Sequence, residues 1–281
     1  MPEILEVEAY RRLAERVVGR TISAVEAPDA WFVKGGATPE AVAVALVNRR
    51  ITALRRHGKV LLLDSCGPTL GLRFGMTGRL LVDGEAAIQH LEWGGRRSDP
   101  SWVRFGLCFR GGGRLWIDDP RRLGGVELEP DVGGLGPDAW TATTAELEQA
   151  LAGGRGPLKA RLLDQARLAG LGNLLVDEVL WRADLSPHRP AGLLDIDEVR
   201  RLRRVVRRVL DQMDRRGGSH TGAAANSRRR VIPSGAPRRN RTSPGSSTVS
   251  PPTSVIHSWP RRIAMTLIPA CTVSSNAESG R

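Results

Sequence analysis

The chain has little of what several classes of protein depend on. Its 281 residues include three cysteines, Cys66, Cys108 and Cys271, which are widely separated and odd in number. They predict reduced thiols, and they support neither a disulfide framework nor a zinc site with four ligands. No run of eighteen apolar residues occurs, so the sequence predicts neither a membrane-spanning helix nor a membrane partner.

Lysine is scarce as well, with three residues against 39 arginines, although the formal net charge is +12. Such a charge suggests a polyanionic partner, but its distribution matters. Residues 215–281 hold eleven arginines and the single acid Glu278, whereas residues 1–214 hold 31 basic and 29 acidic residues. Arginine excess alone is therefore weak evidence for nucleic-acid binding, and Lys34, Lys59 and Lys159 are more informative.

Hydrophobic patterning divides the chain into three regions. Leu5, Ala9, Leu13 and Val17 recur at intervals of four, which predicts an amphipathic helix over residues 3–18. Short apolar or alternating runs separated by Gly, Pro and Asp then predict strands at residues 20–25, 59–64, 69–74, 79–82, 102–109 and 114–117, the pattern of a β-sandwich or barrel. From about residue 138 the periodicity predicts helices over residues 141–152, 157–168, 173–183 and 195–215.

The composition changes again at Gly217. Sequence rich in Ser, Pro and Arg follows, with little periodicity, and it predicts a tail that is largely disordered. A shift at one sharp point also fits a change of reading frame in the gene.

The N-terminus carries the most specific chemistry. Removal of Met1 would leave the secondary amine of Pro2 beside the carboxylates of Glu3 and Glu6. Such an amine can attack an electrophilic carbon and become an iminium while a carboxylate moves the protons. The alternative is a proline at the first position of a helix, with acidic residues complementing the helix dipole. The acidic start also argues against a secretory signal.

Further motifs accompany this start: Arg-His-Gly-Lys ending at Lys59, and the segments 74–78, 119–122, 158–165 and 170–175. With them, residues 1–222 resemble the formamidopyrimidine-DNA glycosylase and endonuclease VIII family. The resemblance implies an α+β fold, in which an N-terminal helix on a β-sandwich precedes a helical domain with a helix-two-turn-helix motif. It divides the chain into a catalytic domain, a DNA-binding domain and a tail in place of the family's zinc finger, at residues 1–136, 137–222 and 223–281.

The resemblance also implies an activity. It predicts a bifunctional DNA glycosylase and apurinic/apyrimidinic lyase of base excision repair, with Pro2 as nucleophile and Glu3 as general acid/base at the sugar ring oxygen. Glu6 matches a second family carboxylate, and Lys59 resembles a lysine that contacts phosphates beside the lesion. A solvated charge at the start of a strand is the alternative for Lys59.

Other residues match the family's contacts to DNA. Those expected to bind DNA are Gly172, Asn173, Lys159, Arg121 and Arg122. For Gly172 and Asn173 the reason is that backbone amides and a helix N-terminus favour an anion. Those expected to fill the void left by the extruded nucleotide are Met76, Arg121 and Leu123. Leu123 stands where the formamidopyrimidine branch usually has Phe. The loop around Gly172 could instead simply join two packed helices, and Met76 could be core.

The expected partner is duplex DNA containing damaged bases or abasic sites, bound by a monomer in the bacterial cytoplasm, associated with the nucleoid. Cys271 with His220 or His257 cannot supply four ligands, so we expect no structural zinc and no other cofactor. Oxidised purines, such as 8-oxoguanine and formamidopyrimidines, and oxidised pyrimidines stay open as substrates. The alternatives are a catalytically weak remnant that still binds DNA, and a nucleic-acid binder of ribosomal type, which accounts for Asn173 but not for Pro2, Glu3 and Lys59.

Overall fold

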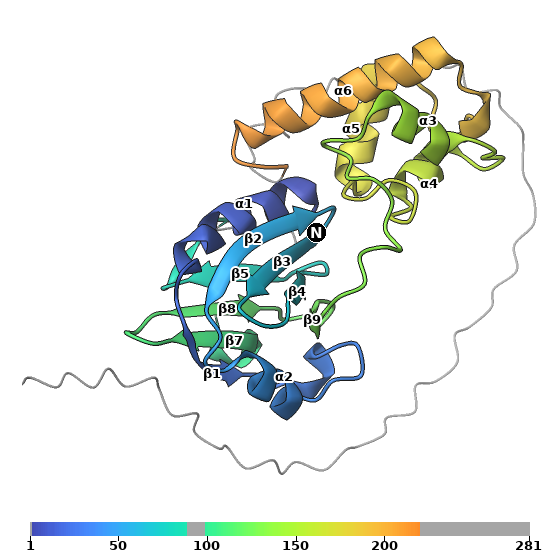
Figure 1. Ribbon diagram of the computed structural model, residues 1–281. Coiled ribbons are helices and arrows are strands. Elements are labelled where there is room, and N and C mark those ends of the chain that lie inside the picture. Colours follow the sequence, from blue (N-terminus) through green and yellow to red (C-terminus); the bar gives the residue numbers. More distant parts are fainter. Residues whose placement is uncertain (1, 89–98, 220–281) are drawn as a thin grey trace, which may run out of the picture. The chain divides into compact units, whose positions relative to one another are not determined.

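The computed structural model describes residues 2–88 and 99–219 (Figure 1). Within them the predicted α+β fold is confirmed: α1 (Ile4–Ala14) and two antiparallel sheets precede a helical region. In this described part no helix is both long and apolar enough to cross a membrane. The predicted tail of residues 223–281 lies outside the described residues, as do Met1 and His220.

The two sheets enclose the larger of two hydrophobic cores. Five strands form one sheet in the order β1 (Ile22–Glu26), β7 (Val103–Phe109), β8 (Arg114–Asp118), β5 (Arg79–Val82) and β6 (Glu85–Ala86). The other has the order β2 (Ile51–His57), β3 (Val60–Ser65), β4 (Leu70–Arg73) and β9 (Gly125–Leu128). All six strands predicted from the sequence are present, with ends displaced by two residues at most.

Strand β2 changes the interpretation of the segment that leads to Lys59. The sequence analysis placed Lys59 at the start of a strand over residues 59–64. In the structure residues 51–57 are themselves a strand, and His57 pairs with Val60 of β3. Gly58, with φ +55°, and Lys59 therefore form the two-residue turn of a hairpin. The elements β9, β6 and α2 (Pro39–Leu46) are also additions to the predicted set.

Helix α1 is shorter than the predicted helix over residues 3–18, because a 3-10 turn follows it at Glu15–Val17. Its first turn, with Ile4 and Leu5, packs in the core of the helical region, whereas later residues such as Val7 and Tyr10 pack in the core of the sheets. Glu3, the residue that precedes α1, therefore lies where the two cores meet.

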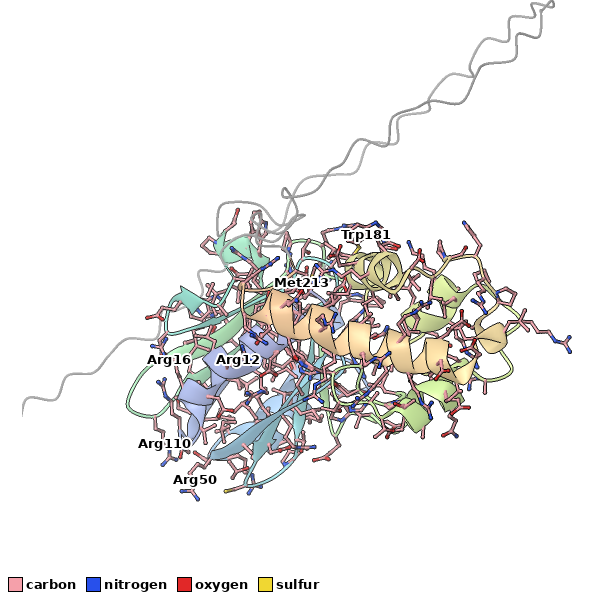
Figure 2. The ribbon with its side chains drawn as sticks, turned by 90° about the horizontal axis from the view of Figure 1, so that it is seen from above. Arg12, Arg16, Arg50, Arg110, Trp181 and Met213 are labelled. Carbon is pink, nitrogen blue, oxygen red and sulfur yellow. The ribbon has the colours of Figure 1, made fainter. Side chains whose placement is uncertain are left out.

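The surface of α1 is tied to the last helix, α6 (Ile196–Asp214). Arg12 donates two hydrogen bonds of 2.9 Å to the carboxylate of Asp214, and Figure 2 shows Arg12 close to Met213 at this end of α6. Arg16, in the 3-10 turn that follows α1, pairs with Glu85 at 2.6 Å. These pairs hold the C-terminal end of α1 and the turn after it to neighbouring elements.

The helical region contains α3 (Thr144–Leu151), α4 (Leu158–Leu163), α5 (Asn173–Ala183) and α6, at the positions that the periodicity predicted. Helix α4 ends five residues before the predicted limit of Leu168. Asp164 stops it by accepting the amide of Ala166 at 3.0 Å, a local bond that competes with continued helix. Two turns then lead into α5, which gives the helix-two-turn-helix arrangement.

Candidate active site

The carboxylate of Glu3 is held at the N-terminus of a helix far along the chain. Its side chain is buried and accepts the backbone amides of Gly172 at 2.7 Å, Leu174 at 3.0 Å and Leu175 at 3.3 Å. The first amides of a helix lack partners within the helix and attract an anion. Glu3 therefore caps α5, in addition to any effect on the dipole of α1.

Burial raises the pKa of Glu3 above its ordinary value, and Glu6 acts in the same direction. The ammonium of Lys59 and the amides of Leu174 and Gly172 oppose this shift without cancelling it. A raised pKa keeps a larger fraction of the carboxyl group protonated near neutral pH, which is the property that a general acid needs. Pro2, the residue before Glu3, is buried too.

Gly172 is needed for this arrangement, because a Cβ there would overlap the carboxylate of Glu3. Its amide donates to Glu3, and the amide of Gly170 donates to Gln165 Oε1 at 2.9 Å. The amides of both loop glycines were predicted to bind a phosphate. In the structure they donate to side chains of the protein itself. Asn173 is exposed, and its side chain has no partner among the described residues, so it stays the predicted phosphate contact of this loop.

Glu6 is fully buried and is fixed by three donors. One oxygen accepts the backbone amide of Glu3 at 2.8 Å, and the other accepts the amide and the hydroxyl of Ser219 at 2.8 and 2.6 Å. Glu6 therefore ties the start of α1 to the last described residue of the chain. This contact adds a positioning role to the acid–base role that the resemblance implied.

Lys59 is half-buried in the hairpin turn between β2 and β3. Burial lowers its pKa, whereas the carboxylates of Glu3 and Glu6 act in the opposite direction. The structure therefore brings the predicted catalytic residues Glu3, Glu6 and Lys59 into one electrostatic group. Since no carboxylate of residues 2–88 and 99–219 pairs directly with the ammonium, it is available to an external anion.

Asp138 connects the hairpin turn to the helical region. Its carboxylate accepts Arg56 Nη1 at 2.5 Å and Nη2 at 3.3 Å, the amide of Gly58 at 2.8 Å and the amide of Trp140 at 3.0 Å. The side chains of Asp138 and Arg56 are each 9% exposed. Because Gly58 precedes Lys59, this buried ion pair fixes the position of the lysine backbone.

The same segment also holds the loop that leads to α5. The amide of Ala139 donates to Ala169 at 2.8 Å, and the amide of Ala169 donates to Pro137 at 2.9 Å. Next along the loop, the carbonyl of Gly170 accepts the amide of Ile4 at 3.1 Å. Residues around Asp138 thus join the Lys59 turn to the loop that carries the partners of Glu3.

The predicted void-filling residues lie on two loops that pack together. Met76 is half-buried in the turn after β4, and Arg121 and Leu123 are exposed in the loop after β8. Gly75 has φ +55°, and a Cβ there would overlap the backbone of Leu123. The close approach of these two backbones therefore requires glycine, and it brings the turn that carries Met76 against the loop that carries Arg121 and Leu123.

Two predicted DNA-binding cations have acidic partners. Arg122 donates two hydrogen bonds of 2.6 Å to Asp29, and Lys159 pairs with Asp177 of α5 at 2.6 Å. The side chains of Arg122 and Lys159 are 50% and 31% exposed, and a cation exposed in this way can exchange its carboxylate partner for another anion. Arg121 has no partner for its guanidinium among the described residues.

No group of three or more potential metal ligands is found in residues 2–88 and 99–219. Cys66 follows β3 of one sheet, and Cys108 lies in β7 of the other. Cys271 lies outside the described residues. The chain's own cysteines therefore do not fit the four-cysteine zinc site that the family resemblance implies.

Fold and site together define the class of the protein: an α+β chain in which a helix and two antiparallel sheets precede a helix-two-turn-helix region that receives an N-terminal glutamate. Two family models match successive segments of the chain. The formamidopyrimidine-DNA glycosylase N-terminal domain matches residues 1–126, and the formamidopyrimidine-DNA glycosylase H2TH domain matches residues 134–224. The chain belongs to the formamidopyrimidine-DNA glycosylase family, as its motifs predicted.

Individual relatives agree with this assignment. A formamidopyrimidine-DNA glycosylase of Paracoccus denitrificans is 40% identical over 236 residues, which cover 78% of this chain and 80% of the relative. The crystal structure of the MutM (Fpg) protein of Thermus thermophilus is 33% identical, with a TM-score of 0.64 and 77% of each chain covered. A complex of Lactococcus lactis Fpg with DNA containing an abasic site is 26% identical, with a TM-score of 0.65 and coverage of 77% of this chain and 80% of that one.

The sequence analysis did not identify the residues that position the site. Asp138 lies in a loop between two regions, where no periodicity marks it. Ser219 lies where the composition begins to change. A signal did exist for the cap of α5: Gly172-Asn173 opens a helix without a Ser, Thr or Asp at the N-cap position, which leaves room for a distant acceptor.

Proposed function

We propose that the chain is a bifunctional DNA glycosylase and apurinic/apyrimidinic lyase that removes oxidised bases from duplex DNA. The observation that carries this proposal is the placement of Glu3. It follows the candidate nucleophile Pro2 directly, it is fixed by the amides of α5, its pKa is raised, and the ammonium of Lys59 lies in the same electrostatic group.

In the proposed reaction, the amine of Pro2, freed by removal of Met1, attacks C1′ of the damaged nucleotide. Glu3 protonates the sugar ring oxygen as the ring opens. The base leaves with the bonding electron pair and takes up the proton that the amine of Pro2 gives up. The product is an iminium between Pro2 and C1′. It acidifies the hydrogens at C2′, so that loss of one of them expels the 3′ phosphate and cleaves the strand. Water then releases the sugar fragment from Pro2.

The other predicted residues would hold the DNA. Lys59 and Asn173 would contact phosphates of the DNA. Lys159 and Arg122 would also bind phosphates, after leaving their present partners Asp177 and Asp29. Phosphate contacts position DNA without reading its sequence. Met76, Arg121 and Leu123 would fill the void that the extruded nucleotide leaves and offset its unstacking.

A catalytically weak remnant that binds damaged DNA is the second candidate. It is favoured by the tail, which holds the single cysteine Cys271 where a four-cysteine zinc finger needs four. We propose accordingly that the chain acts without structural zinc, as a monomer and in the cytoplasm. The first candidate predicts excised base and cleaved strand from duplexes that contain 8-oxoguanine or an oxidised pyrimidine. The second predicts preferential binding to these duplexes with neither product.

A single-turnover assay on both substrates therefore tests the function and also chooses between purine and pyrimidine lesions. A duplex without damage serves as the substrate control. Glu3→Gln serves as the control variant, since it should bind without excising. If the parent chain binds damaged and undamaged duplexes equally and releases no base, both candidates are excluded.

A further inference from the structure

The void-filling loop is held from inside by one fully buried carboxylate, that of Asp119. One oxygen accepts the hydroxyl of Thr77 at 2.5 Å and the backbone amide of Arg121 at 3.2 Å. The other accepts the amide of Gly124 at 2.8 Å. Asp119 thus bonds to both ends of the loop from Arg121 to Leu123, and to the residue that follows Met76.

Asp119 is itself fixed to the sheet. Its backbone amide donates to Trp102 at 2.9 Å, and its carbonyl accepts Arg104 Nε at 2.8 Å. The carboxylate therefore links the end of the β7–β8 pair to two loops, which carry the half-buried Met76 and the exposed Arg121 and Leu123. A buried side chain of this kind is what keeps a recognition group within the narrow range of positions that hydrogen bonding needs.

We propose that Asp119 is the positioning residue for recognition of the base opposite the lesion. It acts through Arg121, whose amide it binds and whose guanidinium, unpaired within residues 2–88 and 99–219, can hydrogen-bond the orphaned base. Its bond to Thr77 keeps Met76 in register with Arg121, so that the gap is filled while the opposite base is read. This inference rests on the proposed function, because Arg121 and Met76 are given there the task of entering the DNA.

Asp29 provides a matched control. It also bonds to this loop, through Arg122, whose side chain is 50% exposed, whereas its own side chain is 10% exposed. Among the described residues its bonds to the loop go only to this side chain and to no backbone amide, so it does not fix the backbone of Arg121. Loss of Asp29 should therefore remove a negative charge beside the loop and leave Arg121 in place.

The experiment measures equilibrium binding to duplexes in which a tetrahydrofuran abasic-site analogue faces C, A, G or T. It needs no catalysis, so it is informative for either candidate function. The parent chain should bind these four duplexes with different affinities. In Asp119→Asn an amide NH2 replaces one acceptor and faces a donor. We expect the spread between the best and the worst opposite base to fall by about fivefold or more, with Asp29→Asn close to the parent.

Dependence on Arg121 separates positioning from a merely structural effect. In an Arg121→Ala background, adding Asp119→Asn should cause no further loss of discrimination. Thr77→Val, which removes one of the three bonds, should give an intermediate loss, and it serves if Asp119→Asn does not fold. The inference is overturned if the parent does not discriminate between opposite bases, or if folded Asp119→Asn keeps the full spread. It is also overturned if Asp119→Asn cannot be folded and Thr77→Val keeps the full spread. Two further results would contradict it: additive losses of discrimination from Asp119→Asn and Arg121→Ala, or a loss in Asp29→Asn as large as that in Asp119→Asn. Base excision and imine trapping by the parent chain test the proposed function separately.

Discussion

Replacing Asp138 by Asn should destabilise the protein strongly, because it breaks a buried ion pair from one side. Asp138 accepts four hydrogen bonds, and two of them come from Arg56, whose side chain is equally buried. Removing one partner of such a pair typically costs about 3–5 kcal/mol, and here Glu8 still accepts Arg56 Nε at 3.3 Å. Since Asn keeps one acceptor oxygen, we expect about 3 kcal/mol, and a fall in Tm of roughly 6–12 °C for a fold of this size.

The adjacent residue pair supplies the control. Arg55 bonds to Asp64 at 2.5 Å, but its side chain is 58% exposed. Asp64→Asn should therefore cost less than about 1 kcal/mol. Thermal unfolding followed by circular dichroism, with urea titration for the free energy, measures both variants. Adding Arg56→Met to Asp138→Asn should restore part of the loss, because the buried guanidinium that has lost Asp138 is removed as well. If Asp138→Asn costs no more than Asp64→Asn, the assignment of Asp138 as the buried link is refuted.

The remaining predictions concern the proposed chemistry. Glu3→Gln should slow base excision by about 10²–10⁴-fold. The protonated carboxyl group is the active form and its pKa is raised, so the parent rate should fall as pH rises through that pKa. The rate of the variant should not show this dependence on pH. Equal single-turnover rates would exclude Glu3 as the acid. Lys59→Ala should reduce the slope of log affinity against log salt by about one unit. Asn173→Ala should weaken binding to lesion and plain duplexes alike, and an effect confined to lesion duplexes would contradict a phosphate contact. Truncation at Gly222 should lower low-salt affinity for undamaged DNA with little change in lesion preference. Stoichiometric zinc in the full chain would show that the tail forms a finger.

Much of the fold could be predicted because its elements carry their own signals. The strands at residues 79–82 and 114–117 alternate or are bounded by Gly and Asp, and α5 begins after a Gly-x-Gly break, so that its limits match the prediction. Strand β2 was missed because it ends in three polar residues, Arg55, Arg56 and His57, which break the alternation of apolar and polar positions. Each is accommodated by a hydrogen-bond partner elsewhere in the chain, and the sequence pattern does not show these partners. Helix α2 is short, and its Ala/Val alternation resembles a strand.

The site could be predicted only as far as its local motifs reached. Pro2 and Glu3 were identified from the chemistry of the N-terminal segment together with the family resemblance, and Lys59 from that resemblance. The partners of these residues could not be, because each contact joins positions far apart in the chain, as Glu3 with Gly172 and Glu6 with Ser219 do. Asp119 was inside a recognised motif, but its role depends on burial and on two loops meeting, and a linear pattern encodes neither.

The central claim, that the N-terminal proline is the nucleophile, is tested most directly by borohydride trapping on a duplex containing an abasic site. Only an amine that attacks C1′ forms an imine that borohydride can reduce to a stable covalent adduct. The account predicts adduct with the chain that begins at Pro2, and loss of adduct when Met1 is retained or when Pro2→Ala displaces the amine. Undiminished adduct from the chain that retains Met1 would contradict it.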